Sequence, residues 1–149
     1  MDGSAPRDLI LLADDEGNSV AVNVLGREPR WAAGLGAEIV VRTPFVSGRT
    51  NLMLSASKLE RWAAALDKLD AGEDVVWMEW GRGPSISVQL TGERDCPEVV
   101  VEDESRSMVT VRVPVDLPDD WIADHRRRLH RVMAHWVPML SAQYSSRRS

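Results

Sequence analysis

Apolar and polar positions alternate in two groups of short segments, a pattern typical of β-strands with one buried face. In the first group, DLILLADDEGNSVAVNVLG holds two β-rich runs around an acidic turn, which predicts a hairpin. Pro44, Ser47 and Gly48 interrupt the next string, AEIVVRTPFVSGRTNLMLS. We therefore expect strands near residues 37–42 and 49–54. The second group consists of DVVWMEW, SISVQL, EVVVED and SMVTVRVPV, separated by short loops.

The segment between the two groups has the period of an α-helix. Its apolar residues recur at steps of three and four: Leu59, Trp62, Leu66 and Leu69. Ser57 and Glu60 have the spacing of a capping box, in which each side chain accepts a backbone N–H. Gly72 stands where a left-handed residue ends many helices. A helix over about residues 57–71 is predicted.

A second helix is expected after Asp116, with Pro118 in its first turn, where the missing N–H of proline costs nothing. Pro138 should stop or kink this helix, and residues 141–149 should form a flexible polar tail. Strands and helices in this order do not give the alternation of a parallel sheet. The sequence predicts one α+β domain over residues 1–140, with a mainly antiparallel sheet of about eight strands and two amphipathic helices.

The two acidic strings ADDEGNSVAV and EDESRSMVTV resemble each other. An ancient duplication would explain the likeness. Hairpin turns that favour the same residue types would explain it as well, without any shared ancestry.

Composition excludes several classes of protein. The chain has 149 residues, 44% of them hydrophobic and 28% charged, as in an ordinary globular domain. No run is long and apolar enough for a membrane span, and the first residues do not look like a secretory signal. A single cysteine, Cys96, favours the cytoplasm. The net charge of −5 disfavours nucleic acid unless basic groups gather in one patch.

The string ADHRRRLHRVMAHW contains three histidines and could be a metal site. At about 100° of rotation per residue, His125, His130 and His135 point in three different directions on a helix. They cannot ligate one metal ion together. His125 lies in the same stripe as the apolar residues that we expect to be buried: Trp121, Ile122, Leu129, Val132, Met133 and Trp136. A hydrogen-bonded core histidine is favoured over a catalytic base.

The arginines of this helix occupy the opposite arc: Arg126, Arg127, Arg128 and Arg131. Asp124 precedes Arg127 and Arg128 by three and four residues, a spacing that allows ion pairs along one face. A solvated helix face is the simpler interpretation. A phosphate-binding stripe is the alternative, because this is the densest basic cluster outside the tail.

Other candidate sites lack the residues that their chemistry needs. GLGAEI precedes a strand instead of opening a helix, and GRGPS lacks the Lys-Ser or Lys-Thr of a nucleotide loop. Cys96 has no neighbouring group that would activate it. Asp14, Asp15 and Glu16 could bind a hard cation, but acidic residues are common in hairpin turns for backbone reasons. We predict no catalytic residue, no metal site and no cofactor.

Tryptophan is unusually frequent, with six residues against one Phe and one Tyr. Trp31 lies in a predicted loop, and Trp77 and Trp80 should point to opposite faces of a strand. An exposed tryptophan is a natural anchor for a protein partner. The candidate partner contacts are Trp31, Trp80, Arg82, Arg127 and Arg131.

Four strings, RDLILLADDEGNSVAVNVLGR, EIVVRTPFVSGR, LERWAAALDKLDAGEDVVW and VRVPVDLPDDWIADHRRRL, resemble an uncharacterised domain family of actinobacteria such as streptomycetes. The resemblance covers about residues 7–132. The order of the elements also resembles the WapI-type immunity proteins, which neutralise bacterial toxins by direct binding. Neither resemblance implies catalytic residues.

Three functions remain open. The first is a cytoplasmic, non-enzymatic protein that binds another protein, as immunity proteins and antitoxins do; the acidic charge suits a basic partner. The second is an enzyme or small-molecule binder with a dispersed site around His125. The third is nucleic-acid binding through the basic face of the second helix. We expect the first.

Overall fold

The structure, a computed structural model, describes residues 5–28, 34–78, 83–92, 95–104 and 106–148, with the backbone alone for residues 141–148. Its elements are β1 (Asp8–Ala13), β2 (Ser19–Arg27), β3 (Leu35–Arg42), β4 (Ser47–Leu54), α1 (Ala56–Asp70), β5 (Val75–Trp77), β6 (Ser85–Gln89), β7 (Glu98–Glu102), β8 (Thr110–Pro114) and α2 (Trp121–Arg148). The predicted order of four strands, a helix, four strands and a helix is confirmed.

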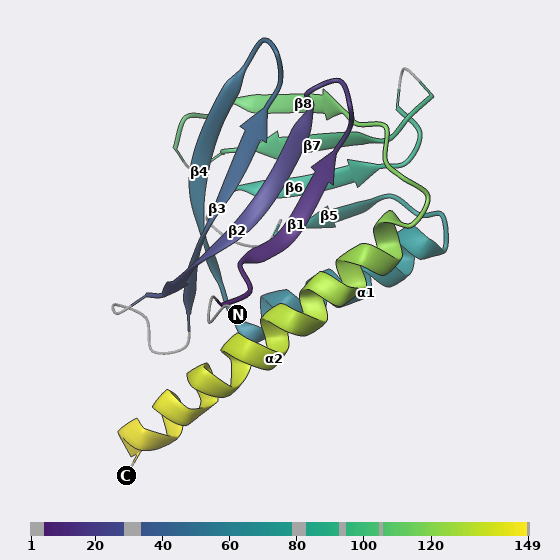
Figure 1. The fold of residues 1–149 in the computed structure, drawn as a ribbon. Coiled ribbons are helices and arrows are strands. Elements are labelled where there is room, and N and C mark those ends of the chain that lie inside the picture. The colour runs from purple at the N-terminus through teal and green to yellow at the C-terminus, as the bar shows by residue number, and fades with distance from the viewer. Residues whose placement is uncertain (1–4, 29–33, 79–82, 93–94, 105, 149) are drawn as a thin grey trace.

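The eight strands form two antiparallel sheets of four, with the orders β1-β2-β3-β4 and β5-β6-β7-β8. Each strand pairs with its neighbour in sequence. The strands of the first sheet run steeply in Figure 1, and those of the second run nearly across it. The predicted α+β class and antiparallel pairing are therefore confirmed, with the strands divided between two crossing sheets.

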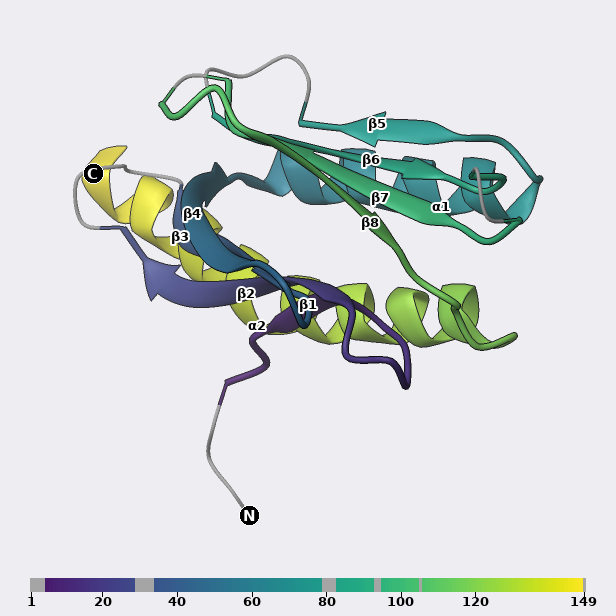
Figure 2. The same cartoon turned by 90° about the horizontal axis from the view of Figure 1, so that it is seen from above.

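The core lies between the two sheets, which appear as separate layers in Figure 2. On β3, alternate residues are buried, as expected for a strand with one face turned inward: Leu35, Ala37, Ile39 and Val41. Both helices lie below the sheets in Figure 1 and close that end of the sandwich. Their buried residues complete the same hydrophobic cluster.

Each helix covers one edge of a sheet. α1 packs along β5, α2 packs along β1, and the two helices contact each other. The helix of the first half thus protects the second sheet and the helix of the second half protects the first, so the halves interlock. In the part of the chain that the structure describes, no other strand pairs with the outer edges of β4 and β8, and neither helix packs along them.

The two similar acidic strings do not occupy equivalent places in this arrangement. ADDEGNSVAV forms the β1–β2 turn, the first turn of its half, whereas EDESRSMVTV forms the β7–β8 turn, the third turn of its half. The likeness does not follow the structural repeat, and this favours shared turn chemistry as its cause.

The first helix begins slightly earlier than predicted. Ser55 is its N-cap, and the Ser55 side chain accepts a hydrogen bond from the Lys58 N–H at 3.3 Å. The capping box predicted for Ser57 is therefore wrong, because Ser57 already lies in the first turn. At the other end, Gly72 has a φ of +85° and donates its N–H to the Leu69 carbonyl, which confirms the predicted left-handed residue.

The second helix departs from its prediction at both ends. It begins at Trp121, so Pro118 precedes the first turn, and the Trp121 N–H bonds to the Pro118 carbonyl. It also continues through Pro138 to Arg148 instead of stopping there. Leu140 is buried beyond the exposed Pro138, and this packing helps to offset the hydrogen bond that proline removes. The backbone of residues 141–148 is helical, and the flexibility of this segment stays a prediction.

Replacing Ser55 with Ala should lower the free energy of unfolding by about 1 kcal/mol, because the Lys58 N–H loses its acceptor. Ser57→Ala is the matched control and should cost only a few tenths of a kcal/mol. Urea unfolding of the two variants measures the difference. An equal loss in both would show that Ser55 is not the cap.

Candidate functional site

His125 lies between α2 and the edge of the first sheet, with 1% of its surface exposed. Its Nε2 accepts the Leu11 N–H of β1 at 3.0 Å. Since Nε2 accepts, Nδ1 carries the hydrogen, and it donates to the Trp121 carbonyl at 2.7 Å. Nε2 thus ties α2 to β1, and the Nδ1 hydrogen bond within α2 fixes the orientation of the ring. The structure confirms that His125 belongs to the buried stripe and is hydrogen-bonded.

Among the described residues, no catalytic pair forms around this imidazole. A carboxylate oxygen of Asp124 lies 4.0 Å from Nδ1, and Asp124 accepts instead from Arg128 Nε at 2.8 Å. Burial lowers the pKa of His125, and the hydrogen bond to Trp121 and the Asp124 charge oppose this shift without reversing it. Among the described residues, no group of three or more His, Cys, Asp or Glu side chains could hold a metal ion.

Three of the four arginines in the predicted basic cluster face carboxylates. Arg126 donates to Asp67 at 2.9 Å and to Asp70 at 3.3 Å, which links α2 to α1. Arg127 and Arg128 lie 3.8 Å and 2.8 Å from Asp124, at the predicted spacings. The hydrogen bond from Arg128 lowers the pKa of Asp124, so this carboxylate stays charged. These pairs cancel much of the charge that a phosphate-binding stripe would need.

The acidic hairpin tips organise their own turns. Asp14 accepts the N–H groups of Glu16 and Asn18, and also that of Asp116 beyond β8. Desolvation alone would raise the pKa of Asp14, but these hydrogen bonds together hold it below its usual value. In the other tip, the Ser107 hydroxyl donates to Asp103 at 2.8 Å and lowers the pKa of that carboxyl. Backbone hydrogen bonding thus explains why acids occur in these turns.

The candidate partner contacts are only partly described. Trp31, Trp80 and Arg82 lie outside the described residues. Arg127 is exposed beside Asp124, and Arg131 lines a groove between α2 and the N-terminal segment. The other tryptophans face inward. Trp62, Trp77 and Trp136 are buried, and Trp121 packs against the core.

A second groove opens between the free edges of the two sheets, with a volume of about 260 Å³. Its lining comes from β3 and β4 on one side and from β7, β8 and their turn on the other. Buried core residues reach its floor: Ile39, Val41 and Val101. Thr50 donates to Asp103 at 3.3 Å across the two walls. We name this the edge groove.

The edge groove exists because β4 has small residues at its inward positions. Gly48 pairs with the buried Val41, and Thr50 pairs with the buried Ile39, so both positions face the core. A Cβ atom added at Gly48 would meet no atom within 4 Å. Further along the strand, Leu52 and Leu54 fill the corresponding positions. The missing volume at Gly48 leaves the sandwich open at this edge.

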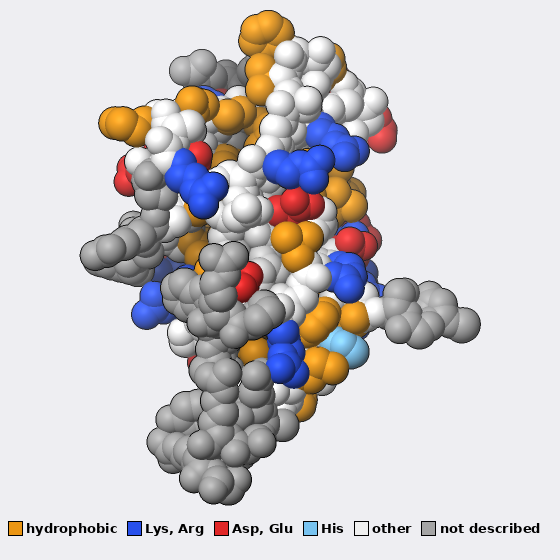
Figure 3. Space-filling view, turned by 90° about the vertical axis from the view of Figure 1, so that its left-hand side faces the viewer, with side chains coloured by type: hydrophobic (Ala, Val, Ile, Leu, Met, Phe, Trp, Pro, Cys, Tyr) orange, Lys and Arg blue, Asp and Glu red, His pale blue; other side chains and the backbone are white. Residues whose placement is uncertain are grey.

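Two apolar hairpin tips border the edge groove. Phe45 in the β3–β4 turn is 94% exposed, and Met108 in the β7–β8 turn is 82% exposed. The next residue in each turn, Val46 or Val109, is partly exposed and lines the groove. Figure 3 looks onto the β4 edge and shows hydrophobic side chains projecting at the upper end of this face. Sequence analysis missed these residues, although PFV and MV interrupt otherwise polar turns.

Replacing His125 with Leu should lower the free energy of unfolding by about 1–3 kcal/mol, because the Leu11 N–H loses its acceptor.

The wild-type protein should lose stability as the pH falls from about 7 to 5.5. The pKa of His125 is lowered in the folded protein, so the unfolded chain binds a proton at a higher pH than the folded chain does. The slope is at most about 1.4 kcal/mol per pH unit.

Urea unfolding across this pH range measures both effects. The Leu variant should lack the part of the slope that His125 causes. The same slope in both proteins would contradict a buried, neutral imidazole.

Comparison with known proteins gives a family and no function. In the described part of the chain, no helix is long and apolar enough to cross a membrane. No curated protein and no solved structure matches the sequence. A model of a family of unknown function, DUF5959, matches residues 7–137, and the chain therefore belongs to this family.

Proposed function

We propose that this protein binds another protein through the edge groove and that the partner supplies an extended segment. The observation that carries the proposal is an opening that reaches the core and is lined by Val46 and Val109, the neighbours of the exposed Phe45 and Met108. Exposed apolar surface of this kind is typical of interaction sites. The partner segment would pair with β4 and insert an apolar side chain into the groove.

Three properties favour an extended segment over a small molecule. The free edge of β4 offers backbone N–H and C=O groups to an added strand. The volume of about 260 Å³ is below the range of roughly 300–1,000 Å³ that is usual for small-molecule pockets. Half of the lining residues are valine or isoleucine, and Arg49 and Asp103 are its charged members. Because the lining has one charge of each sign, the edge groove itself does not favour a basic partner. The expectation of a basic partner therefore depends on the net charge of the chain alone.

The other two functions have less support. Both ring nitrogens of His125 are engaged in hydrogen bonds, Nε2 with β1 and Nδ1 within α2, which leaves the enzyme hypothesis without its main residue. The nucleic-acid hypothesis is weakened by the carboxylates that face Arg126, Arg127 and Arg128. The resemblance to WapI-type immunity proteins supports a function that consists of complex formation. The single cysteine supports our proposal that the complex forms in the cytoplasm.

Gly48→Val provides the sharpest test. Valine suits a strand, its Cβ would meet no atom within 4 Å, and its side chain would occupy the inward position, so we expect unchanged or higher stability. Capture from an extract of the native cell, followed by quantitative mass spectrometry, should lose the stoichiometric partner by at least tenfold. Phe45→Ser should weaken capture by about tenfold or more, as expected for an apolar anchor.

Leu25→Ser is the matched control, because Leu25 is exposed on β2 and does not line the edge groove. It should retain the partner. Equal capture by wild type and Gly48→Val would overturn the proposal. So would a homodimer in light scattering that Gly48→Val disrupts, because the groove would then be occupied by a second copy.

A further inference from the structure

Another groove lies between α2 and the N-terminal segment, with a volume of about 790 Å³. Its charged lining consists of three arginines, Arg7, Arg128 and Arg131, and one carboxylate, Asp8. His130 and His135 add two imidazoles, and Ala5, Pro6 and Ala134 are the remaining lining residues. Asp124 pairs with Arg128 from outside the lining, so Arg7 and Arg131, with Asp8 as the single lining carboxylate, leave a small local excess of positive charge in a chain with a net charge of −5. We name this the arginine groove.

The N-terminal wall of the arginine groove is firmly held. The Trp136 indole N–H donates to the Pro6 carbonyl at 2.8 Å. Arg7 donates through Nη1 to the carbonyls of Val24 at 3.0 Å and Leu25 at 2.7 Å, and its guanidinium lies 6.0 Å from the centre of the Trp136 ring. These contacts fix Arg7 and leave its Nε and Nη2 donors without a protein acceptor among the described residues.

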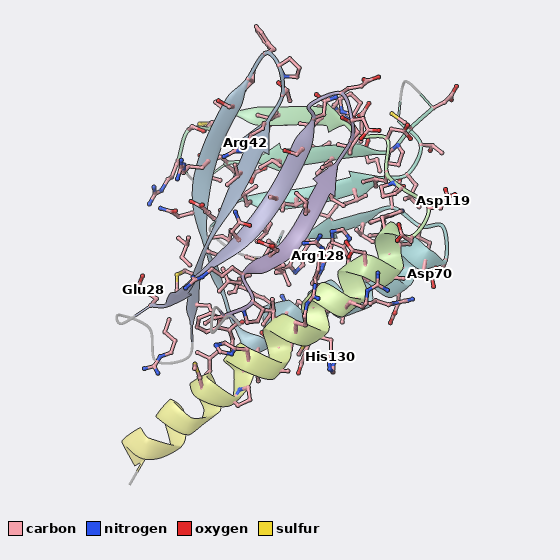
Figure 4. The ribbon with its side chains drawn as sticks, viewed as in Figure 1. Glu28, Arg42, Asp70, Asp119, Arg128 and His130 are labelled. Carbon is pink, nitrogen blue, oxygen red and sulfur yellow. The ribbon has the colours of Figure 1, made fainter. Side chains whose placement is uncertain are left out.

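The helix wall holds one fixed guanidinium and one free one. Arg128 uses Nε for Asp124, which orients the group and leaves both terminal nitrogens as donors. Arg131, one turn further along, is exposed and has no partner among the described residues. In Figure 4, Arg128 extends from α2 towards β1, while His130 lies on the opposite side of the helix and forms the outer margin.

We propose that the arginine groove binds a small phosphorylated molecule. Guanidinium groups recognise phosphate oxygens through paired, charge-assisted hydrogen bonds, and two of the three groups here are already oriented. The volume lies within the range of roughly 300–1,000 Å³ that is usual for small ligands. This site is separate from the edge groove, with which it shares no lining residue.

The test uses inorganic pyrophosphate as the probe and the full-length chain, followed by amide NMR shifts at constant ionic strength. Saturable shifts should be confined to residues 5–8 and 128–135. Arg131→Gln should weaken binding by roughly tenfold, the effect of losing one charge-assisted hydrogen bond. Its midpoint of thermal unfolding should stay unchanged, because Arg131 is exposed and unpaired within the described chain.

Arg42→Gln is the control, since Arg42 is an exposed arginine on β3, away from α2 (Figure 4). It should bind pyrophosphate like the wild type. An equal loss in both variants, or no saturable shift at millimolar pyrophosphate, would overturn the proposal. Tighter binding of a single-stranded oligonucleotide, with a steep dependence on salt, would also overturn it by assigning the groove to nucleic acid.

Discussion

The structure depends on which of the four edge strands of its two sheets are covered. An edge strand presents unpaired N–H and C=O groups, which must be covered, bonded to water or offered to another chain. Here α2 covers β1 and α1 covers β5. The hydrogen bond from the Leu11 N–H to His125 shows how closely the cover fits, because a helix side chain satisfies a strand donor directly. β4 and β8 have no such cover among the described residues, and the edge groove lies between them.

The order of the elements could be predicted from sequence because it depends on local periodicity. The burial of His125 followed from helical geometry, since its position shares a face with apolar residues. The N-cap was harder to predict, because Ser55 and Ser57 are both good capping residues and only the path of the chain after β4 distinguishes them. The continuation of α2 past Pro138 involves Leu140, a tertiary contact that the local rule on proline does not include.

Neither groove could be predicted, because each joins segments that are distant in sequence. The edge groove brings Gly48 of β4 opposite the β7–β8 turn, and a glycine in a strand gives no sign of which face it leaves open. The arginine groove adds Arg7 to Arg128 and Arg131. Sequence spacing did predict the pairs of Asp124 along α2. It could not predict that Arg126 faces the acids of α1, and that contact makes part of the basic cluster a link between the helices.

The two apolar tips support the proposal of a partner segment at the edge groove. Phe45 and Met108 belong to the third turn of each half, so they occupy equivalent positions. Met108 has a φ of 60°, a left-handed conformation that costs a residue other than glycine roughly 1–2 kcal/mol. Neither side chain gains much burial in return, since 94% of Phe45 and 82% of Met108 are exposed. Packing among the described residues does not offset these costs, whereas contact with a partner segment at the edge groove would do so.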